Sequence, residues 1–126
     1  MLLPLLKSDL YDILVACVEG NLKESLVSWL DGFACTVVCA APGYPNAYPK
    51  GSTIHGIDEA NALADVQVYQ AGTVLSPSGV TVTNGGRVLA VTGVGASLEA
   101  AVETAYKGVN KLCFDGMHYR KDIAKR

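Results

Sequence analysis

The sequence predicts an α+β domain in which an antiparallel sheet or small barrel carries packed helices. Apolar residues recur at helical spacing only near the beginning and near the end of the chain. Between these two segments lie short β-rich runs, separated by turn residues such as Gly, Pro, Asn and Asp. Successive strands joined by short turns tend to pair antiparallel, and helices before and after them can pack on the resulting sheet.

A first helix is expected over residues 5–18, where apolar side chains recur three or four residues apart and Gly20-Asn21 follows. This helix starts inside an apolar run, and no residue before it is suited to cap its N-terminus. From this abrupt start we expect that the chain was cut from a longer protein. One face should then be unusually apolar and promote self-association, with Leu2, Leu3, Leu5 and Leu6 as candidates.

The middle of the chain predicts several short strands. Residues 26–30 and 34–41 read as a hairpin that turns at Asp31-Gly32. A long loop over residues 42–51 follows, and loops of this length are often functional. Further strands are expected near 53–56, at 66–70, on both sides of the turn at 76–79, and at 87–93, with a helical turn near 58–63.

The strongest helical pattern covers residues 97–112. Ser97 is suited to cap it, and the apolar stripe comprises Leu98, Ala101, Val102, Ala105, Val109 and Leu112. The preceding Gly93-Val94-Gly95 resembles part of a dinucleotide fingerprint, but Leu98 stands where a third Gly or Ala is needed. Because no βαβ unit can follow, we interpret these glycines as a strand-to-helix turn.

Composition excludes several classes of function. The chain has 126 residues, half of them hydrophobic, and a net charge of −2, which does not favour nucleic acid or an anionic membrane as a partner. No two of the four cysteines form a C-x-x-C pair, so Cys35 and Cys39 are expected to be buried free thiols of a cytoplasmic protein. His55 and His118 lack metal-ligand spacing with any other ligand, so no metal site is predicted.

Two cationic features are candidate binding sites. Asn84-Gly85 predicts the tight turn of a hairpin, but Gly86 and Arg87 are not needed for such a turn. Glycines expose backbone amides and allow close approach, and an arginine beside them suits a carboxylate or phosphate. The alternative is a hairpin tip with a solvated arginine. The second feature, Tyr119-Arg120-Lys121-Asp122, likewise fits either an anion contact or a solvated tail with an internal ion pair.

Six stretches, taken together and in this order, resemble the C-terminal domain of the phosphoribosylamine–glycine ligases, also called glycinamide ribonucleotide synthetases. The resemblance covers about residues 26–126, and residues 1–25 resemble the last helix of the family's ATP-grasp region. The stretches are GYPNAYPKG (43–51), IHGIDEA (54–60), VYQAGT (68–73), VTNGGRVLAVTGVG (82–95), AxxxAYKGV (101–109) and FDGMHYRKDI (114–123).

The resemblance implies an ATP-dependent ligase of cytoplasmic purine (IMP) biosynthesis, often part of a multifunctional enzyme, that joins glycine to 5-phosphoribosylamine. It implies a rudiment-hybrid, barrel-sandwich type of domain that works with upstream preATP-grasp and ATP-grasp domains. ATP and Mg²⁺ are the family's cofactors, but the family's N-x-R-x-G-D-x-E segment for magnesium is absent from this sequence. We therefore expect the chain alone to bind neither cofactor and to be inactive.

The resemblance also implies roles for particular residues. We expect Arg87 to contact glycine's carboxylate or the acyl phosphate, with Asn84, Gly85 and Gly86 shaping its loop. We expect Arg120 to contact a phosphate or a domain interface, and Gly43 and Tyr44 to serve interdomain packing. No catalytic residue is assigned. The alternatives are a rudiment-hybrid domain of another ATP-grasp ligase or carboxylase, and a free-standing interaction module.

Overall fold

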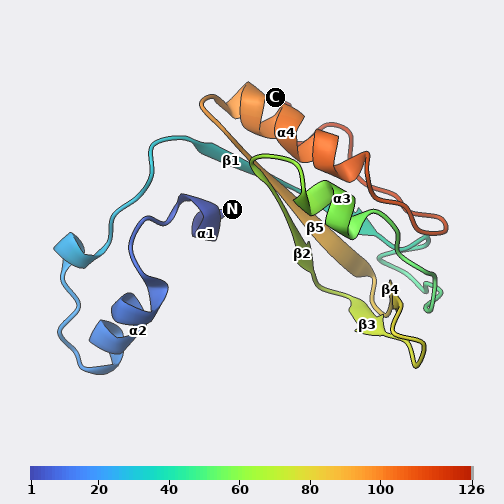
Figure 1. Cartoon of the computed structure of the whole chain (residues 1–126), viewed down its shortest axis with the longest axis horizontal. Helices are drawn as coiled ribbons and strands as arrows, with labels where there is room; N and C mark the ends of the chain where they lie inside the picture. The colour runs from blue at the N-terminus through green and yellow to red at the C-terminus, as the bar shows by residue number, and fades with distance from the viewer. Residues whose placement is uncertain (126) are drawn as a thin grey trace.

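The computed structural model describes residues 1–125 and confirms an α+β fold with antiparallel strands (Figure 1). No helix within that range is long and apolar enough to cross a bilayer. The elements in chain order are α1 (Leu2–Leu5), α2 (Leu10–Val18), the 3-10 turn η1 (Glu24–Leu26), β1 (Phe33–Ala40), α3 (Ile57–Asn61), β2 (Val66–Gln70), β3 (Thr73–Leu75), β4 (Thr81–Thr83), β5 (Arg87–Gly95) and α4 (Leu98–Val109).

The centre of the fold is a three-stranded sheet in the order β1-β5-β2, with both pairs antiparallel. Helix α4 lies along one face of this sheet, and the N-terminal segment extends away from its other side (Figure 1). The core lies between the sheet and α4 and is built mainly from small and β-branched side chains. Its fully buried members include Val37, Cys39, Val88, Leu89, Val91, Ala101, Ala105 and Val109.

Glycines in β5 bring α4 unusually close to the sheet. A Cβ atom on Gly93 would lie 2.6 Å from the Ala101 carbonyl oxygen, and one on Gly95 would lie 2.6 Å from the Ala101 nitrogen. Since neither backbone atom can move aside without moving the helix, only glycine permits this packing. The prediction that Gly93-Val94-Gly95 leads from a strand into a helix is confirmed.

The cap predicted for the last helix is present, but α4 ends at Val109, so Leu112 of the predicted stripe lies beyond the helix. The Ser97 hydroxyl accepts a hydrogen bond of 3.2 Å from the Ala100 amide, which satisfies one of the free donors in the first turn. Within the predicted stripe, Ala101, Ala105 and Val109 are fully buried, whereas Leu98 is 42% exposed. Leu98 is the first residue of the helix and lines a surface hollow with Val102 and Ile123.

The prediction of one helix over residues 5–18 is wrong. The chain is extended at Leu6 and begins a new helix after Asp9, whose carboxylate accepts a hydrogen bond of 2.7 Å from the Tyr11 amide. Asp9 is therefore the N-cap of α2, although no cap was predicted before the helix. An aspartate directly before the first residue of a helix can cap it, and the apolar spacing did not reveal that Asp9 does so.

Residues 26–30 do not form the predicted strand. Leu26 closes the turn η1, and only Trp29 makes a single bridge, to Leu6. The backbone of this stretch instead bonds to the N-terminal segment, with the Leu30 amide donating to the Leu5 carbonyl at 2.8 Å. The strand expected near 53–56 is likewise reduced to isolated bridges at Thr53 and His55.

The predicted hairpin turn at Asn84-Gly85 is also wrong, because β4 pairs with β3 and β5 pairs with β2. These four strands form one long antiparallel ribbon that bends between β2 and β3 and between β4 and β5 (Figure 1). The turn of the ribbon lies at residues 76–79, as predicted, with the Ser76 hydroxyl accepting from the Val80 amide at 3.1 Å. Asn84-Gly85 therefore belongs to the bend of the ribbon.

Candidate functional site

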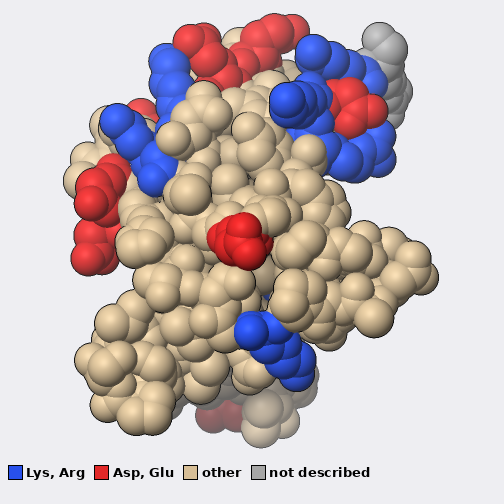
Figure 2. Space-filling model, turned by 90° about the vertical axis from the view of Figure 1, so that its right-hand side faces the viewer, with Lys and Arg blue, Asp and Glu red and all other residues tan. Residues whose placement is uncertain are grey.

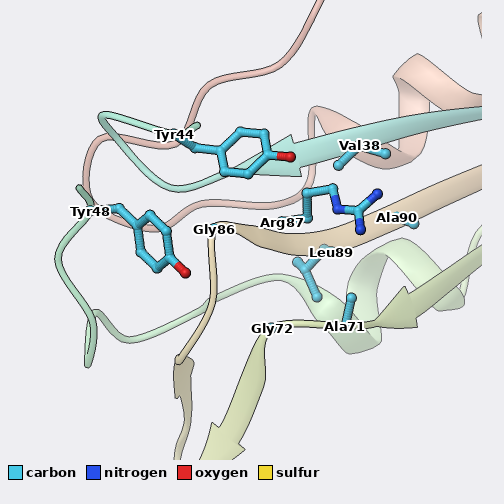
Figure 3. Close-up of a pocket in the computed structure, with 9 residues that line it drawn as sticks. All are labelled: Val38, Tyr44, Tyr48, Ala71, Gly72, Gly86, Arg87, Leu89 and Ala90. Carbon is cyan, nitrogen blue, oxygen red and sulfur yellow. The ribbon is translucent and has the colours of Figure 1, made fainter. Parts of the chain in front are cut away.

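A pocket of about 500 Å³ opens where β1 ends, the ribbon bends and β5 begins (Figure 3). Its wall is mostly apolar and comes from Val38, Ala71, Leu89 and Ala90. The rings of Tyr44 and Tyr48 close one side, and Gly72, Gly86 and Arg87 complete the lining. The volume lies within the roughly 300–1,000 Å³ range of small-molecule sites.

Arg87 contributes the only charged side chain among the described residues that line this pocket. It is the first residue of β5, next to a β-bulge: Cys39 pairs with Leu89 and Ala40 pairs with Arg87, so Val88 has no partner in β1. Bulges redirect side chains, and here Val88 is buried while Arg87 is exposed. Within residues 1–125 the Arg87 guanidinium forms no salt bridge, so it is available to an anionic ligand.

Gly86 lets the tyrosine loop pack directly against the start of β5. A Cβ atom on Gly86 would overlap the Tyr44 ring and would lie 2.9 Å from Cε1 of Tyr48. The Ala41 amide also donates a hydrogen bond of 2.8 Å to the Gly86 carbonyl. The backbone immediately before Arg87 is thus held by the loop that carries both tyrosines.

On the other side of this backbone, Gly85 lies against Gly72. A Cβ atom on Gly72 would lie 2.7 Å from the Gly85 Cα atom and 2.6 Å from the Arg87 carbonyl oxygen. The Asn84 amide donates to the Gly72 carbonyl at 2.7 Å. Of the three residues expected to shape the Arg87 loop, Gly86 lines the pocket, whereas Asn84 and Gly85 fix the bend behind it.

Arg120 is not among the residues that line this pocket. Its Nε and Nη2 atoms donate to the two carboxylate oxygens of Asp122 at 2.9 and 2.7 Å, on an exposed part of the tail. These hydrogen bonds lower the pKa of the Asp122 carboxyl and raise that of the Arg120 guanidinium. The Tyr106 hydroxyl holds this tail by donating to the Arg120 carbonyl at 2.7 Å.

Gly43 and Tyr44, expected to serve interdomain packing, lie in the loop beside the pocket. Gly43 has a φ of +89°, and a Cβ atom there would overlap the Ala47 carbonyl oxygen, so glycine is needed to turn the loop. Tyr44 is 37% exposed and lines the pocket. Their role between domains stays a prediction.

Sequence reasoning did not assign the other lining residues to a site, and two of these, Tyr48 and Gly72, meet the backbone before Arg87. Tyr48 follows Tyr44 by four positions in the same loop, and this spacing alone does not indicate that both rings meet one glycine. Gly72 lies between two strand segments, and a glycine that interrupts a strand run can mark a bend or a close approach of another backbone. The partner in that approach, Gly85, depends on the pairing of the bent ribbon and could not be read from the sequence.

The remaining chemistry of the described residues is modest. No group of three His, Cys, Asp or Glu side chains within residues 1–125 could hold a metal ion. Cys35 and Cys39 are buried and unpaired as predicted, and burial raises the pKa of the Cys39 thiol to about 11. On the face in Figure 2, charged side chains gather mainly toward the upper rim, and much of the rest is uncharged.

Comparisons with known proteins agree with this fold. A family model, phosphoribosylglycinamide synthetase C domain, matches residues 34–126. The chain is 48% identical over its whole length to a bifunctional purine biosynthetic protein of Dictyostelium discoideum, of which it spans 16%. It is 50% identical over 98% of its length to a phosphoribosylamine–glycine ligase of a Synechocystis strain, of which it spans 29%.

A solved structure of a phosphoribosylamine–glycine ligase has a similar fold. The crystal structure of a phosphoribosylamine–glycine ligase from Thermotoga maritima superposes with a TM-score of 0.75 at 37% identity. The match covers 90% of this chain and 27% of the Thermotoga chain. In each of these comparisons the chain therefore spans less than a third of the relative's length.

Proposed function

Because the chain belongs to the phosphoribosylglycinamide synthetase C-domain family, we propose that it serves as the C-terminal domain of a phosphoribosylamine–glycine ligase. In this role it acts with preATP-grasp and ATP-grasp domains of the same parent chain. The observation that carries the proposal is the family match over residues 34–126, together with the pocket at Arg87 that lies inside the matched region.

The proposed reaction joins glycine to 5-phosphoribosylamine in cytoplasmic purine (IMP) biosynthesis. Glycine's carboxylate is activated by ATP as an acyl phosphate, and the amine then displaces the phosphate. Arg87 faces the reacting groups and binds glycine's carboxylate or the acyl phosphate through its planar guanidinium. A donor placed where negative charge develops stabilises the transition state more than the substrate.

ATP and Mg²⁺ belong to the upstream domains in this proposal. The described part of the chain offers no cluster of carboxylates for Mg²⁺, and the Arg87 pocket, lined by one cation and apolar groups, fits an anionic group better than a hydrated metal. The chain alone is then inactive. Residues 1–25 are assigned to the end of the ATP-grasp region and residues 26–126 to the C-terminal domain.

Finer features of the fold form part of the same proposal. A rudiment-hybrid, barrel-sandwich arrangement is supported by bridges that link the sheet to neighbouring segments, between Ala40 and His118 and between Thr53 and Val82. We keep Arg120 assigned to a phosphate or a domain interface. To make either contact, the Arg120 guanidinium would have to release the Asp122 carboxylate and bind the new partner in its place.

A chimeric enzyme tests this function. The segment of the Synechocystis ligase that matches this chain is replaced by residues 1–126, and ADP release is measured with glycine and phosphoribosylamine. The matched control is the Synechocystis ligase with that segment deleted. Turnover that requires both substrates in the chimera, and is absent from the deleted enzyme, supports the proposal. A folded chimera without such turnover contradicts it.

A further inference from the structure

The pocket holds a second donor beside Arg87 that the sequence did not identify as one. Figure 3 shows the Tyr44 hydroxyl and the Arg87 guanidinium reaching into the same side of the pocket, next to Val38. Tyr48 also lines the pocket, but Figure 3 shows its hydroxyl directed toward the lower part of the view and not at the guanidinium. The two tyrosines therefore contribute similar rings and differ in what their hydroxyl groups can reach.

Neither donor is engaged elsewhere. Within residues 1–125 the Tyr44 hydroxyl has no hydrogen-bond partner, in contrast to that of Tyr106, which bonds to the tail at both Arg120 and Ile123. The Arg87 guanidinium has no carboxylate partner in the same range. An acceptor-rich anion can take hydrogen bonds from both groups at once, because each of its oxygens has more than one lone pair.

The surroundings favour an anion that belongs to a larger molecule. The described lining contains no acidic side chain, and its aliphatic part lowers the local polarity, which strengthens charge-assisted hydrogen bonds. A volume of about 500 Å³ exceeds what one carboxylate or phosphoryl group fills. The remaining space lies against Leu89, Ala90 and the tyrosine rings, where the body of a small ligand would be held.

We propose that Tyr44 is a substrate-binding residue whose hydroxyl, with Arg87, holds the carboxylate or phosphoryl group of a small ligand. This inference rests on the proposed function for the identity of that ligand, but not for the existence of the anion site. Gly86 is what makes the arrangement possible, since any side chain there would displace the Tyr44 ring. Tyr44 thus links the loop over residues 42–51 to the chemistry at Arg87.

The test is a titration of the ¹⁵N-labelled chain, observed at the Arg87 side-chain Nε–H signal. Glycine and acetate serve as carboxylate probes, and inorganic phosphate and ribose 5-phosphate as phosphoryl probes. Tyr44→Phe keeps the ring against Gly86 and removes only the hydroxyl, Tyr48→Phe is the matched control, and Arg87→Met removes the cation. Backbone amide spectra show whether each variant keeps the fold, and for Arg87→Met the amide signals report binding.

We expect Tyr44→Phe to weaken binding of at least one probe about tenfold, the usual effect of losing a hydrogen bond to a charged group. Tyr48→Phe should bind as the unaltered chain does, and Arg87→Met should not bind. If Tyr44→Phe binds as tightly as the unaltered chain, the role of Tyr44 is wrong, while the site at Arg87 stands. If no probe binds, or Arg87→Met binds normally, the anion site itself is refuted, whatever the chimera shows.

Discussion

Gly72 and Gly85 touch backbone to backbone at the bend of the long ribbon, where a Cβ atom on Gly72 would lie 2.7 Å from the Gly85 Cα atom. This contact lets β3 and β4 turn away from the sheet that contains β2 and β5. It also fixes the backbone two residues before Arg87. A feature of chain geometry thus sets the position of the charged side chain in the pocket.

Gly72→Ala should destabilise the fold. The new methyl group would collide with backbone atoms of Gly85 and Arg87, and overpacking of this kind typically costs about 1–3 kcal/mol in the free energy of unfolding. Urea denaturation followed by circular dichroism measures the change. Gly51→Ala is the control, because nothing lies within 4 Å of that position and only its φ of +89° is strained. Equal losses in the two variants would contradict the close contact.

Gly86→Ala should affect activity more than stability. The methyl group would meet side-chain atoms of Tyr44 and Tyr48, which can swing outward more easily than backbone can shift. In the chimeric ligase we expect kcat/KM for glycine to fall, while the denaturation midpoint of the isolated chain changes little. A large loss of stability with normal catalysis would show that the tyrosine contact is purely structural.

Ser97→Ala should remove the cap of α4. The lost hydrogen bond to the Ala100 amide is expected to lower the free energy of unfolding by about 1 kcal/mol. Urea denaturation provides the measurement, and Ser25→Ala is the matched control, because Ser25 is exposed and its hydroxyl makes no hydrogen bond within residues 1–125. A loss no greater than that of the control would mean that the cap contributes nothing.

Stability should decrease at alkaline pH because of Cys39. Burial raises the pKa of its thiol to about 11 from an ordinary 9.0. The stabilisation is fully present below pH 9 and is lost as the pH rises toward 11, since the unfolded chain then releases a proton that the folded chain retains. Unfolding curves across this range should show a steeper decline for the natural chain than for Cys39→Ala. Parallel declines would contradict the assignment.

Self-association is expected to come from the exposed face of α2. Tyr11, Leu14 and Val18 are 72%, 55% and 88% exposed, and Leu2 and Leu3 are exposed nearby in sequence. The double variant Leu14→Gln, Val18→Lys should reduce the average mass seen by light scattering, whereas Leu75→Gln at the exposed ribbon should not. A natural chain that stays monomeric at high concentration would contradict this prediction.

The sequence predicted those parts of the fold that depend on local patterns. The strand at 66–70, the turn at 76–79, the cap at Ser97 and the buried thiols follow from periodicity, turn chemistry and capping. The break at Asp9 and the missing strand at 26–30 did not, because both depend on how the N-terminal segment bonds to itself. The predicted hairpin turn at Asn84-Gly85 also failed for a non-local reason. Asn and Gly suit both a hairpin turn and a bend, and only the strand pairing distinguishes the two.

The candidate site was predictable only in part. A lone arginine after two glycines indicated Arg87 and Gly86, and the structure brings both into the pocket. The same sequence pattern could not indicate Tyr48 or Gly72. Tyr48 reaches the pocket through a folded loop, and Gly72 reaches it through long-range strand pairing. Residues that meet only after folding leave no local signal.

The most direct test of the account is the kinetics of the chimeric ligase with Arg87→Lys. Lysine keeps the charge but cannot form the planar two-point contact, so we expect kcat/KM for glycine to fall about 10²–10³-fold. Lys107→Arg, on the exposed surface of α4, is the control and should leave both kcat and KM unchanged. If Arg87→Lys also leaves kcat and the glycine KM unchanged, Arg87 is a surface residue and the central claim is wrong.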